Sequence, residues 1–260
     1  MNDALYIAAT GMQAQQTNVE TIANNLVNSS TTAYKRSRVS FTDMVSAEAG
    51  RSSQQASVVD ANLLVPAQRN GAGVAIAALT KQFDLGTVTK TDSTYDLAIN
   101  GDGFFSVTMP DGSTAYTRGG TLRINSDGQL ATQAGYPLKP GIAIPADAQS
   151  MAITASGHVQ ILGAGQTVAS DAGQLELVRF SSPGQLSAQG DNLYRATDKS
   201  DEPLTGDGIG AIQQGYLEGS NISMVDEMVN LMVAQRAYES SVKVVQASDE
   251  MLGMINNLRR

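Results

Sequence analysis

The chain has 260 residues and a formal net charge of −8, with one His and neither Cys nor Trp. The acidic balance argues against a nucleic-acid-binding protein, which needs a basic face. The absence of Cys excludes thiol catalysis, disulfides and Cys-ligated metals.

Residues 1–33 open the chain with the pattern of a helix, and they carry no sign of a cleaved secretory signal. MNDALYIAATGMQAQQ lacks the basic start and unbroken apolar run of such a signal, and no segment of the chain approaches the length of a membrane span. Apolar residues instead recur every seven positions, with a companion set three residues later, as in a helix that packs along a partner helix. The first set is Leu5, Met12, Val19 and Leu26, and the second is Ala8, Gln15 and Ile22.

The helical pattern stops in the segment ANNLVNSSTTAYKR, residues 23–36. Small amide and hydroxyl side chains follow one another there, and such side chains satisfy the backbone groups left unpaired at a helix end. A small basic cluster follows, made of Lys35, Arg36 and Arg38. Two interpretations of this cluster stay open: a solvated linker, or a group that docks on the acidic surface of a neighbouring copy.

Residues 34–95 are predicted to connect the first helix to the next domain, with an extended arm at about 45–70. This arm is rich in Ser, Ala and Gln, which is typical of a flexible linker. It also holds a short apolar patch at Val58, Val59 and 63–65, which favours an arm that becomes ordered against neighbours.

Residues 96–221 read as a β-rich domain, because the apolar period changes to two and turn signals recur at short intervals. PDG and SDG sequences predict hairpins at 110–112 and 126–128. Gly101-Asp102-Gly103 lacks the third glycine and the following helix of a phosphate-binding loop, so we predict a hairpin turn there as well. His158 has no carboxylate pair or second His near it in the sequence, which argues against a catalytic role.

Residues 222–260 are predicted to form the closing helix. The apolar surface of this helix is wider than a single partner requires, and it is rich in Met, which adapts to irregular contacts. Two interpretations follow: an antiparallel hairpin with the first helix, or helices that also contact other copies. The predicted contact residues are Leu5, Met12, Val19, Ile22, Leu26, Met224, Met228, Leu231, Tyr238, Val242, Val245 and Leu252.

The residues alone therefore predict an α+β protein that is not an enzyme. Residues 1–33 and 222–260 would form one discontinuous helical domain, and the β domain would lie between them. The sequence offers no cofactor or metal motif. Two other classes stay open: a secreted adhesin-type module that joins a coiled coil to β structure, and an enzyme that opens peptidoglycan with a pair of carboxylates.

Three blocks in the same order resemble the rod and hook proteins of the bacterial flagellar axis. DLAINGDGFFSV and AYTRGGTLRINSDGQLAT resemble the central block of that family, and QGYLEGSNISMVDEMVNLMVAQRAYE followed by ASDEML resembles its C-terminal block. ANNLVNSSTTAYKR resembles the N-terminal signature, in which the chain leaves a helix. The residues that match this helix-exit signature are Asn24, Asn25, Asn28, Thr31, Tyr34 and Lys35.

The resemblance implies a structural subunit that polymerises into a helical tube, with the terminal helices inside and the β domain outside. Such a tube transmits motor torque to the hook and lets exported subunits pass. The implied partners are copies of the chain itself, proximal rod proteins, the hook protein, the periplasmic and outer-membrane ring proteins and the type III export apparatus. Neither nucleic acid nor direct membrane insertion is implied, and the implied location is the basal-body rod in the periplasm.

Within that family, the length argues against the hook protein, and the arm favours the distal rod, with the proximal rod paralogue as the alternative. Two positions depart from the family pattern, and the first is Ser29, which stands where an apolar residue is more usual. Ala33 stands where Gly is common, and Ala tolerates positive φ poorly. The sequence therefore argues against a left-handed residue at 33.

Overall fold

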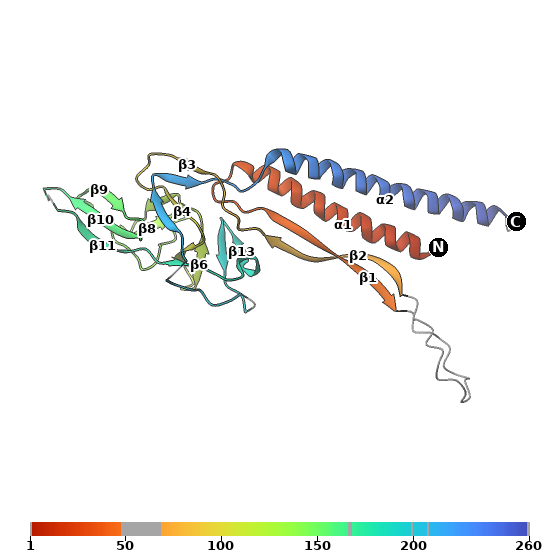
Figure 1. The fold of residues 1–260 in the computed structure, drawn as a ribbon, viewed down its shortest axis with the longest axis horizontal. Coiled ribbons are helices and arrows are strands. Elements are labelled where there is room, and N and C mark those ends of the chain that lie inside the picture. The colour runs from red at the N-terminus through yellow and green to blue at the C-terminus, as the bar shows by residue number, and fades with distance from the viewer. Residues whose placement is uncertain (1, 48–68, 166–167, 199, 207, 259–260) are drawn as a thin grey trace, which may run out of the picture. The chain divides into compact units, whose positions relative to one another are not determined.

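The structure is a computed structural model that describes residues 2–47, 69–165, 168–198, 200–206 and 208–258 (Figure 1). An N-terminal helix, a mostly-β middle and a C-terminal helix confirm the predicted α+β class. The chain divides into two compact units. The helical unit comprises residues 1–24, 37–80 and 225–260, and the β unit comprises residues 25–36 and 81–224.

The helical unit is formed mainly by helices α1 (Asn2–Val27) and α2 (Met224–Leu258). The two helices lie side by side and run in opposite directions (Figure 1). At Gly11 an added Cβ would lie 3.7 Å from the Ser241 Oγ, so this position of α1 faces α2. That distance is an ordinary van der Waals contact, so the packing of the two helices there does not require glycine.

The side chains that α2 buries within the chain are small or polar. Glu227, Ala234 and Ser248 are buried and lie on one line along the helix, at intervals of seven and fourteen residues. The Ser248 hydroxyl donates to the Val244 carbonyl at 2.8 Å, so its polar group is satisfied inside the helix. The large apolar side chains of α2 consequently lie elsewhere on its surface. In α1 the buried apolar residues are Ala8, Ala14 and Ile22.

Two long strands, β1 (Ser37–Ala47) and β2 (Arg69–Lys81), pair as a two-stranded sheet where the sequence predicted only a connecting segment. The Val74 N–H donates to the Thr10 hydroxyl at 3.4 Å, which ties β2 to α1. Gly73 has a φ of 111°, and a Cβ there would collide with that hydroxyl, so this contact requires glycine. The predicted arm at 45–70 lies almost wholly outside the described residues.

The β unit contains short strands in several small sheets. The largest has five strands in the order β12-β5-β6-β14-β13, a three-stranded sheet has the order β11-β10-β9, and β15-β4, β16-β3 and β7-β8 form pairs. The strands are β3 (Val88–Lys90), β4 (Leu97–Asn100), β5 (Phe104–Thr108), β6 (Thr114–Thr117), β7 (Leu122–Ile124), β8 (Leu130–Thr132), β9 (Ala148–Ile153), β10 (His158–Gly163), β11 (Ser170–Gln174), β12 (Leu177–Val178), β13 (Ser187–Gly190), β14 (Leu193–Arg195), β15 (Ala211–Gln214) and β16 (Tyr216–Glu218).

Two of the three predicted hairpins are confirmed. The PDG turn joins β5 to β6 and the SDG turn joins β7 to β8, and both pairs are antiparallel. The prediction of a hairpin at Gly101-Asp102-Gly103 was wrong. This turn connects β4 to β5, which pair with strands of two different sheets. The glycine-rich turn therefore carries the chain from one sheet to another, and it leaves its backbone carbonyls available to other partners.

The core of the β unit fills the space between these sheets. Leu97, Ile99, Phe105 and Val107 are fully buried in the larger of two apolar clusters. A smaller cluster is aromatic, with the Phe83 and Phe104 rings edge to face at 5.3 Å between centroids. Among the described residues, no helix is long and apolar enough to cross a membrane.

Candidate functional site: the segment after the first helix

The segment that follows α1 is closed by its own polar side chains. A single 3-10 turn, η1 (Asn28–Ser30), continues from the last residue of α1. The Thr31 hydroxyl donates to the Asn28 Oδ1 at 3.1 Å, and the Thr31 N–H donates to the Asn28 carbonyl at 3.1 Å. The Tyr34 hydroxyl reaches back to the buried Asn25 Oδ1 at 3.5 Å. The two side-chain bonds join these side chains to one another, whereas the sequence pattern predicted bonds from side chains to the backbone groups at the helix end.

Ala33 adopts the left-handed conformation that the sequence argued against. Its φ is 55°, and its side chain is buried. The Ala33 N–H donates to the Glu218 carbonyl at 2.8 Å, so a contact with β16 holds the residue in this conformation. Tertiary contacts thus overcome a local preference of about 1–2 kcal/mol.

The left-handed conformation at 33 predicts stability losses of different size for two substitutions. Ala33→Gly relieves the backbone strain, but it loosens the unfolded chain and deletes a buried methyl, so its net effect is within about 1 kcal/mol of zero. Ala33→Val adds a β-branched side chain at positive φ in a buried position, and we expect it to lower stability by more than about 2 kcal/mol. Urea unfolding of the two variants measures both effects. Equal losses would contradict the left-handed assignment.

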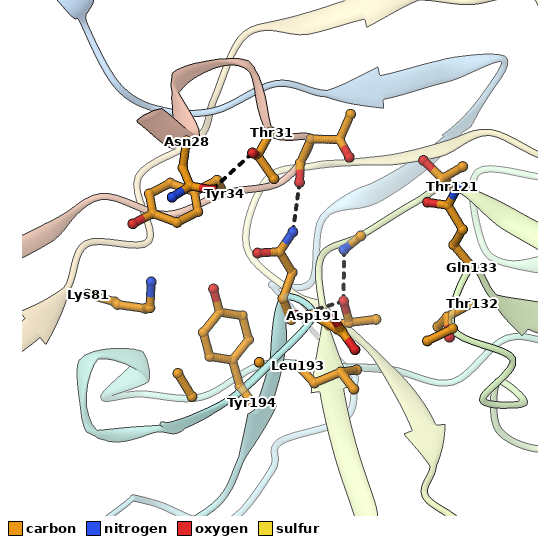
Figure 2. Close-up of a pocket in the computed structure, with 17 residues that line it drawn as sticks. Asn28, Thr31, Tyr34, Lys81, Thr121, Thr132, Gln133, Asp191, Leu193 and Tyr194 are labelled. Atoms are coloured by element: carbon orange, nitrogen blue, oxygen red, sulfur yellow. Dashed lines mark hydrogen bonds between the residues drawn. The ribbon is translucent and has the colours of Figure 1, made fainter. Parts of the chain in front are cut away.

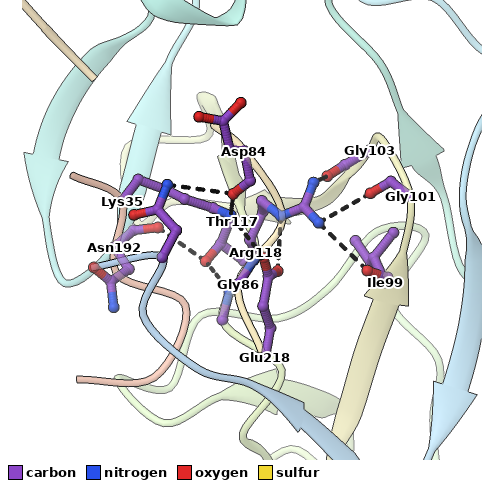
Figure 3. Close-up of polar contacts among 12 residues, drawn as sticks. Lys35, Asp84, Gly86, Ile99, Gly101, Gly103, Thr117, Arg118, Asn192 and Glu218 are labelled. Atoms are coloured by element: carbon purple, nitrogen blue, oxygen red, sulfur yellow. Dashed lines mark hydrogen bonds and ion pairs between the residues drawn. The ribbon is translucent and has the colours of Figure 1, made fainter. Parts of the chain in front are cut away.

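Lys35 is the centre of a buried ionic cluster (Figure 3). Its side chain is 0% exposed, and its Nζ lies 2.6 Å from the Glu218 Oε1. The same Nζ donates to the Asp84 carbonyl at 2.6 Å. The Glu218 Oε1 also accepts the Gly86 N–H at 3.0 Å. Residues that lie 183 positions apart in the sequence therefore meet in one bonded group.

Arg118 completes this cluster from the other side of the carboxylate. Its Nε donates to the Glu218 Oε2 at 2.8 Å. The rest of the guanidinium donates to the Gly103 and Gly101 carbonyls, each at 3.0 Å, and to the Ile99 carbonyl at 3.3 Å (Figure 3). The turn after β4 does not form a hairpin, and its carbonyls instead accept hydrogen bonds from the buried Arg118. One carboxylate and several carbonyls together solvate two buried cations.

The pKa values of Lys35 and Glu218 are both lowered, but for different reasons. Burial and the nearby Arg118 charge lower the pKa of the Lys35 amine, against the opposing attraction of Glu218. Burial alone would raise the pKa of the Glu218 carboxyl. The Arg118 and Lys35 charges, with the Gly86 N–H, outweigh it and hold that pKa below its ordinary value. The carboxylate form of Glu218 is therefore the form that the cluster stabilises.

Both interpretations of the basic cluster were wrong for Lys35, which is neither in a solvated linker nor available to a neighbouring copy. It is fully buried against Glu218 of its own chain. Arg36 is held through its backbone, since its N–H donates to the Asn221 Oδ1 at 2.8 Å. Arg38 is exposed at the start of β1.

A groove of about 700 Å³ runs beside the same segment (Figure 2). Across this groove the Asn192 Nδ2 donates to the Thr32 carbonyl at 2.9 Å. Asp191 and Asn192 have φ values of 50° and 57°, and they form the tight turn that joins β13 to β14. Burial raises the pKa of the Tyr194 hydroxyl in the wall of the groove. Residues 31–36, which belong to the β unit, are therefore bonded to the rest of that unit at Asn192 as well as at Glu218.

The predicted site residues differ in how deeply the structure buries them. In the helix-exit signature, Asn25, Tyr34 and Lys35 are buried, Asn28 and Thr31 are half-buried, and Asn24 is exposed. Sequence reasoning missed Glu218, Arg118, Asn192 and Asn221 as partners of this signature. Among the predicted contact residues, Met224, Met228 and Tyr238 are exposed, Ile22 is buried, and Leu5, Met12, Val19, Leu26, Leu231, Val242, Val245 and Leu252 are half-buried.

The described part of the chain contains no group of His, Asp and Glu side chains suited to hold a metal ion. The His158 Nδ1 lies 3.4 Å from a carboxylate oxygen of Asp171, and both side chains are about half exposed. The ionic cluster is closed off from solvent, so its groups bind one another rather than a substrate. The geometry of the site is that of a structural junction.

Comparison with known families finds three matching models along the chain. Residues 5–35 match "Flagella basal body rod protein", residues 98–161 match "Flagellar hook protein FlgE/F/G D1 domain", and residues 213–258 match "Flagellar basal body rod FlgEFG protein C-terminal". The ionic cluster draws Lys35 from the first of these regions, Arg118 from the second and Glu218 from the third.

Curated relatives match over the full length. The chain is 42% identical to the flagellar basal-body rod protein FlgG of Borreliella burgdorferi over 100% of both chains. It is 40% identical to FlgG of Caulobacter vibrioides, over 98% of this chain and 99% of the relative. It is 35% identical to the flagellar basal-body rod protein FlgF of the same organism, over 98% of this chain and 100% of the relative.

The chain belongs to the family of flagellar basal-body rod proteins. This confirms the resemblance seen in the three sequence blocks. The protein is a structural subunit of the flagellar rod and not an enzyme, and it is located in the flagellar basal body. Membership of the family also implies that it assembles with other components of the flagellum.

Proposed function

We propose that the chain polymerises into the distal segment of the rod, as a helical tube that carries motor torque to the hook and lets exported subunits pass. The observation that carries the proposal is the apolar surface of α2. Val225 is 71% exposed and Met232 is 54% exposed, and both lie in the first third of the helix. A lone soluble chain gains nothing from such a surface, whereas a polymer buries it between copies.

The proposed interface is formed by the heptad residues of α1 and α2 that the chain leaves uncovered. Within one chain, α2 buries the line of Glu227, Ala234 and Ser248. Its remaining apolar residues are thus free to pack in coiled-coil fashion on helices of neighbouring copies. The proposed contact is heterologous, which means that one surface of a copy packs on a different surface of the next copy. When such a contact repeats without closing into a ring, it produces a filament.

The distal position is supported by a higher sequence identity to FlgG, the distal rod protein of the family, than to its paralogue FlgF. The FlgG protein of Borreliella burgdorferi is 42% identical to this chain, and the FlgF protein of Caulobacter vibrioides is 35% identical. The partners that follow from a distal position are the proximal rod proteins below and the hook protein above. The surrounding ring proteins and the export apparatus complete the proposed set.

Electron microscopy of basal bodies from cells that lack this chain tests the proposal. We expect a short rod stub without a hook, because the proximal segment assembles before the distal one. Loss of the whole rod would place the chain in the proximal segment. An intact rod with a hook would overturn the assignment to the distal rod.

A further inference from the structure

The backbone passes between the helical unit and the β unit at four points, after residues 24, 36, 80 and 224. On the β unit's side, the segments next to these four points are hydrogen-bonded to one another. They are residue 25, residues 34–36, residues 81–84 and residues 218–221, and we call them together the collar. All of these residues belong to the β unit itself.

Asn221 is the hub of the collar. Its Oδ1 accepts the Arg36 N–H at 2.8 Å, and its Nδ2 donates to the Gln82 carbonyl at 2.9 Å and to the Asp84 carbonyl at 3.3 Å. Its backbone N–H donates to the Tyr34 carbonyl at 3.4 Å. One amide side chain thus connects three segments that are far apart in the sequence.

A second set of bonds closes the collar without Asn221. The Gln82 N–H donates to the Arg36 carbonyl at 2.8 Å, and the Lys81 Nζ donates to the Lys35 carbonyl at 3.2 Å. The Lys81 ammonium also lies 4.6 Å from the centre of the Tyr34 ring, a cation–π contact. The Tyr34 hydroxyl extends the set to Asn25, which comes directly after the first passage.

The collar is anchored to the β core by the ionic cluster. Lys35 and Glu218 are members of both, and Arg118 carries the connection to the turn after β4. Asp84 accepts hydrogen bonds from both Lys35 and Asn221 through the same carbonyl. A displacement of one segment is therefore resisted by bonds to the other segments and by a buried charge pair.

We propose that the collar is a mechanical coupling, in which a force that enters the β unit through any one of the four passages is shared among all of them. In its mechanical part the inference rests on the proposed torque-carrying function. Its structural part is that residues 34–36, 81–84 and 218–221 lose their mutual hydrogen bonds together rather than one segment at a time. Shared opening is a property of the isolated chain, and it holds whether or not the chain polymerises.

Hydrogen exchange on the full chain tests shared opening through the amides of Arg36 and Gln82. Asn221→Ala removes the acceptor of the Arg36 N–H but leaves the acceptor of the Gln82 N–H, the Arg36 carbonyl, in place. We expect protection to fall at least ~10-fold at both amides, with the Leu97 amide in the core unchanged. Loss at Arg36 alone would overturn the inference, since the bonds would then act separately.

A second variant and a control keep this test decisive. Lys81→Met deletes one bond of the collar and leaves Asn221 in place, so it remains informative if Asn221→Ala does not fold. We expect faster exchange at the Asn221 amide, which lies on a different segment and donates to the Tyr34 carbonyl rather than to any group of Lys81. Unchanged exchange at Asn221 in that variant would also overturn shared opening. Gln189→Ala removes an exposed side-chain amide from β13 and should leave exchange at Arg36, Gln82 and Asn221 unchanged.

Cells that carry Asn221→Ala test the mechanical part. We expect rods and hooks in normal number, with swimming speed falling more steeply than in wild type as the viscosity of the medium rises. Equal slopes would overturn load sharing. If cells that lack the chain kept an intact rod and hook, the distal-rod assignment would be wrong, but the hydrogen-exchange result on the isolated chain would still hold. The failure of the proposed function and the failure of shared opening are therefore distinguishable.

Discussion

Glu218→Gln is expected to lower the free energy of unfolding of the chain by about 3–5 kcal/mol, because it leaves two buried cations without their shared anion. Glu218 contacts Lys35 at 2.6 Å and Arg118 at 2.8 Å, and all three side chains are almost fully buried. The glutamine side chain keeps the shape of the original and one acceptor oxygen. The loss therefore measures the charge, together with the hydrogen bond at the oxygen that becomes an NH2 group, rather than a cavity. Urea unfolding followed by tyrosine fluorescence gives the value.

Lys35→Met is the matched comparison. It removes one cation and leaves the Arg118–Glu218 pair complete, so we expect a smaller loss of about 1–3 kcal/mol, from the hydrogen bonds to Glu218 and to the Asp84 carbonyl. A larger loss for Lys35→Met than for Glu218→Gln would contradict the account of uncompensated charge. Asp92→Asn breaks the exposed pair of Lys90 and Asp92 and should leave the midpoint unchanged.

The same cluster gives the chain a predicted dependence on acid. The folded pKa of Glu218 lies below its ordinary value, so the unfolded chain binds this proton first as the pH falls. The stabilisation from Glu218 is fully present above the unfolded pKa of about 4.3, and it is lost as the pH falls through the lower folded pKa. We expect the stability difference between wild type and Glu218→Gln to shrink below about pH 4.5.

Patterns among residues close in the sequence were enough to predict both terminal helices and two hairpins. The seven-residue repeat gave both terminal helices, and the PDG and SDG turns gave two hairpins of the β unit. The strands β1 and β2 were missed. Alternation is weak there, since Ala and Gly occupy much of β2 and most residues of β1 are exposed. Only their pairing with each other identifies them as strands.

The junction could not be predicted, because its partners are remote in the sequence. Lys35 meets Glu218 across 183 positions, and Arg118 meets Glu218 across 100. Nothing next to Lys35 in the sequence separates a buried lysine from a solvated one. The resemblance marked Lys35 as part of a signature, but it did not identify the carboxylate. Ala33 shows the same limit, since a contact with β16 sets a conformation that its own side chain disfavours.

Met228→Glu is expected to abolish assembly while leaving the chain folded. Met228 is 48% exposed in α2, so the free chain tolerates a carboxylate there. In a polymer the same position is buried against a neighbour, and an unpaired charge would then be desolvated at a penalty of several kcal/mol per copy. Since the contact repeats along the filament, every subunit would carry this penalty. Motility and electron microscopy of basal bodies measure assembly, and circular dichroism of the purified chain measures folding.

Gln246→Glu is the control for this prediction, because it adds the same charge to the same helix at an exposed position that is already polar. We expect normal rods from it. If both variants blocked assembly, the added charge itself would be the cause, and the apolar surface would lose its assigned role. If Met228→Glu assembled normally, the proposed interface would have to lie on another face of α2. The half-buried Leu231 and Val242 would then be the next residues to test, since they lie nearer the line that α2 buries within its own chain.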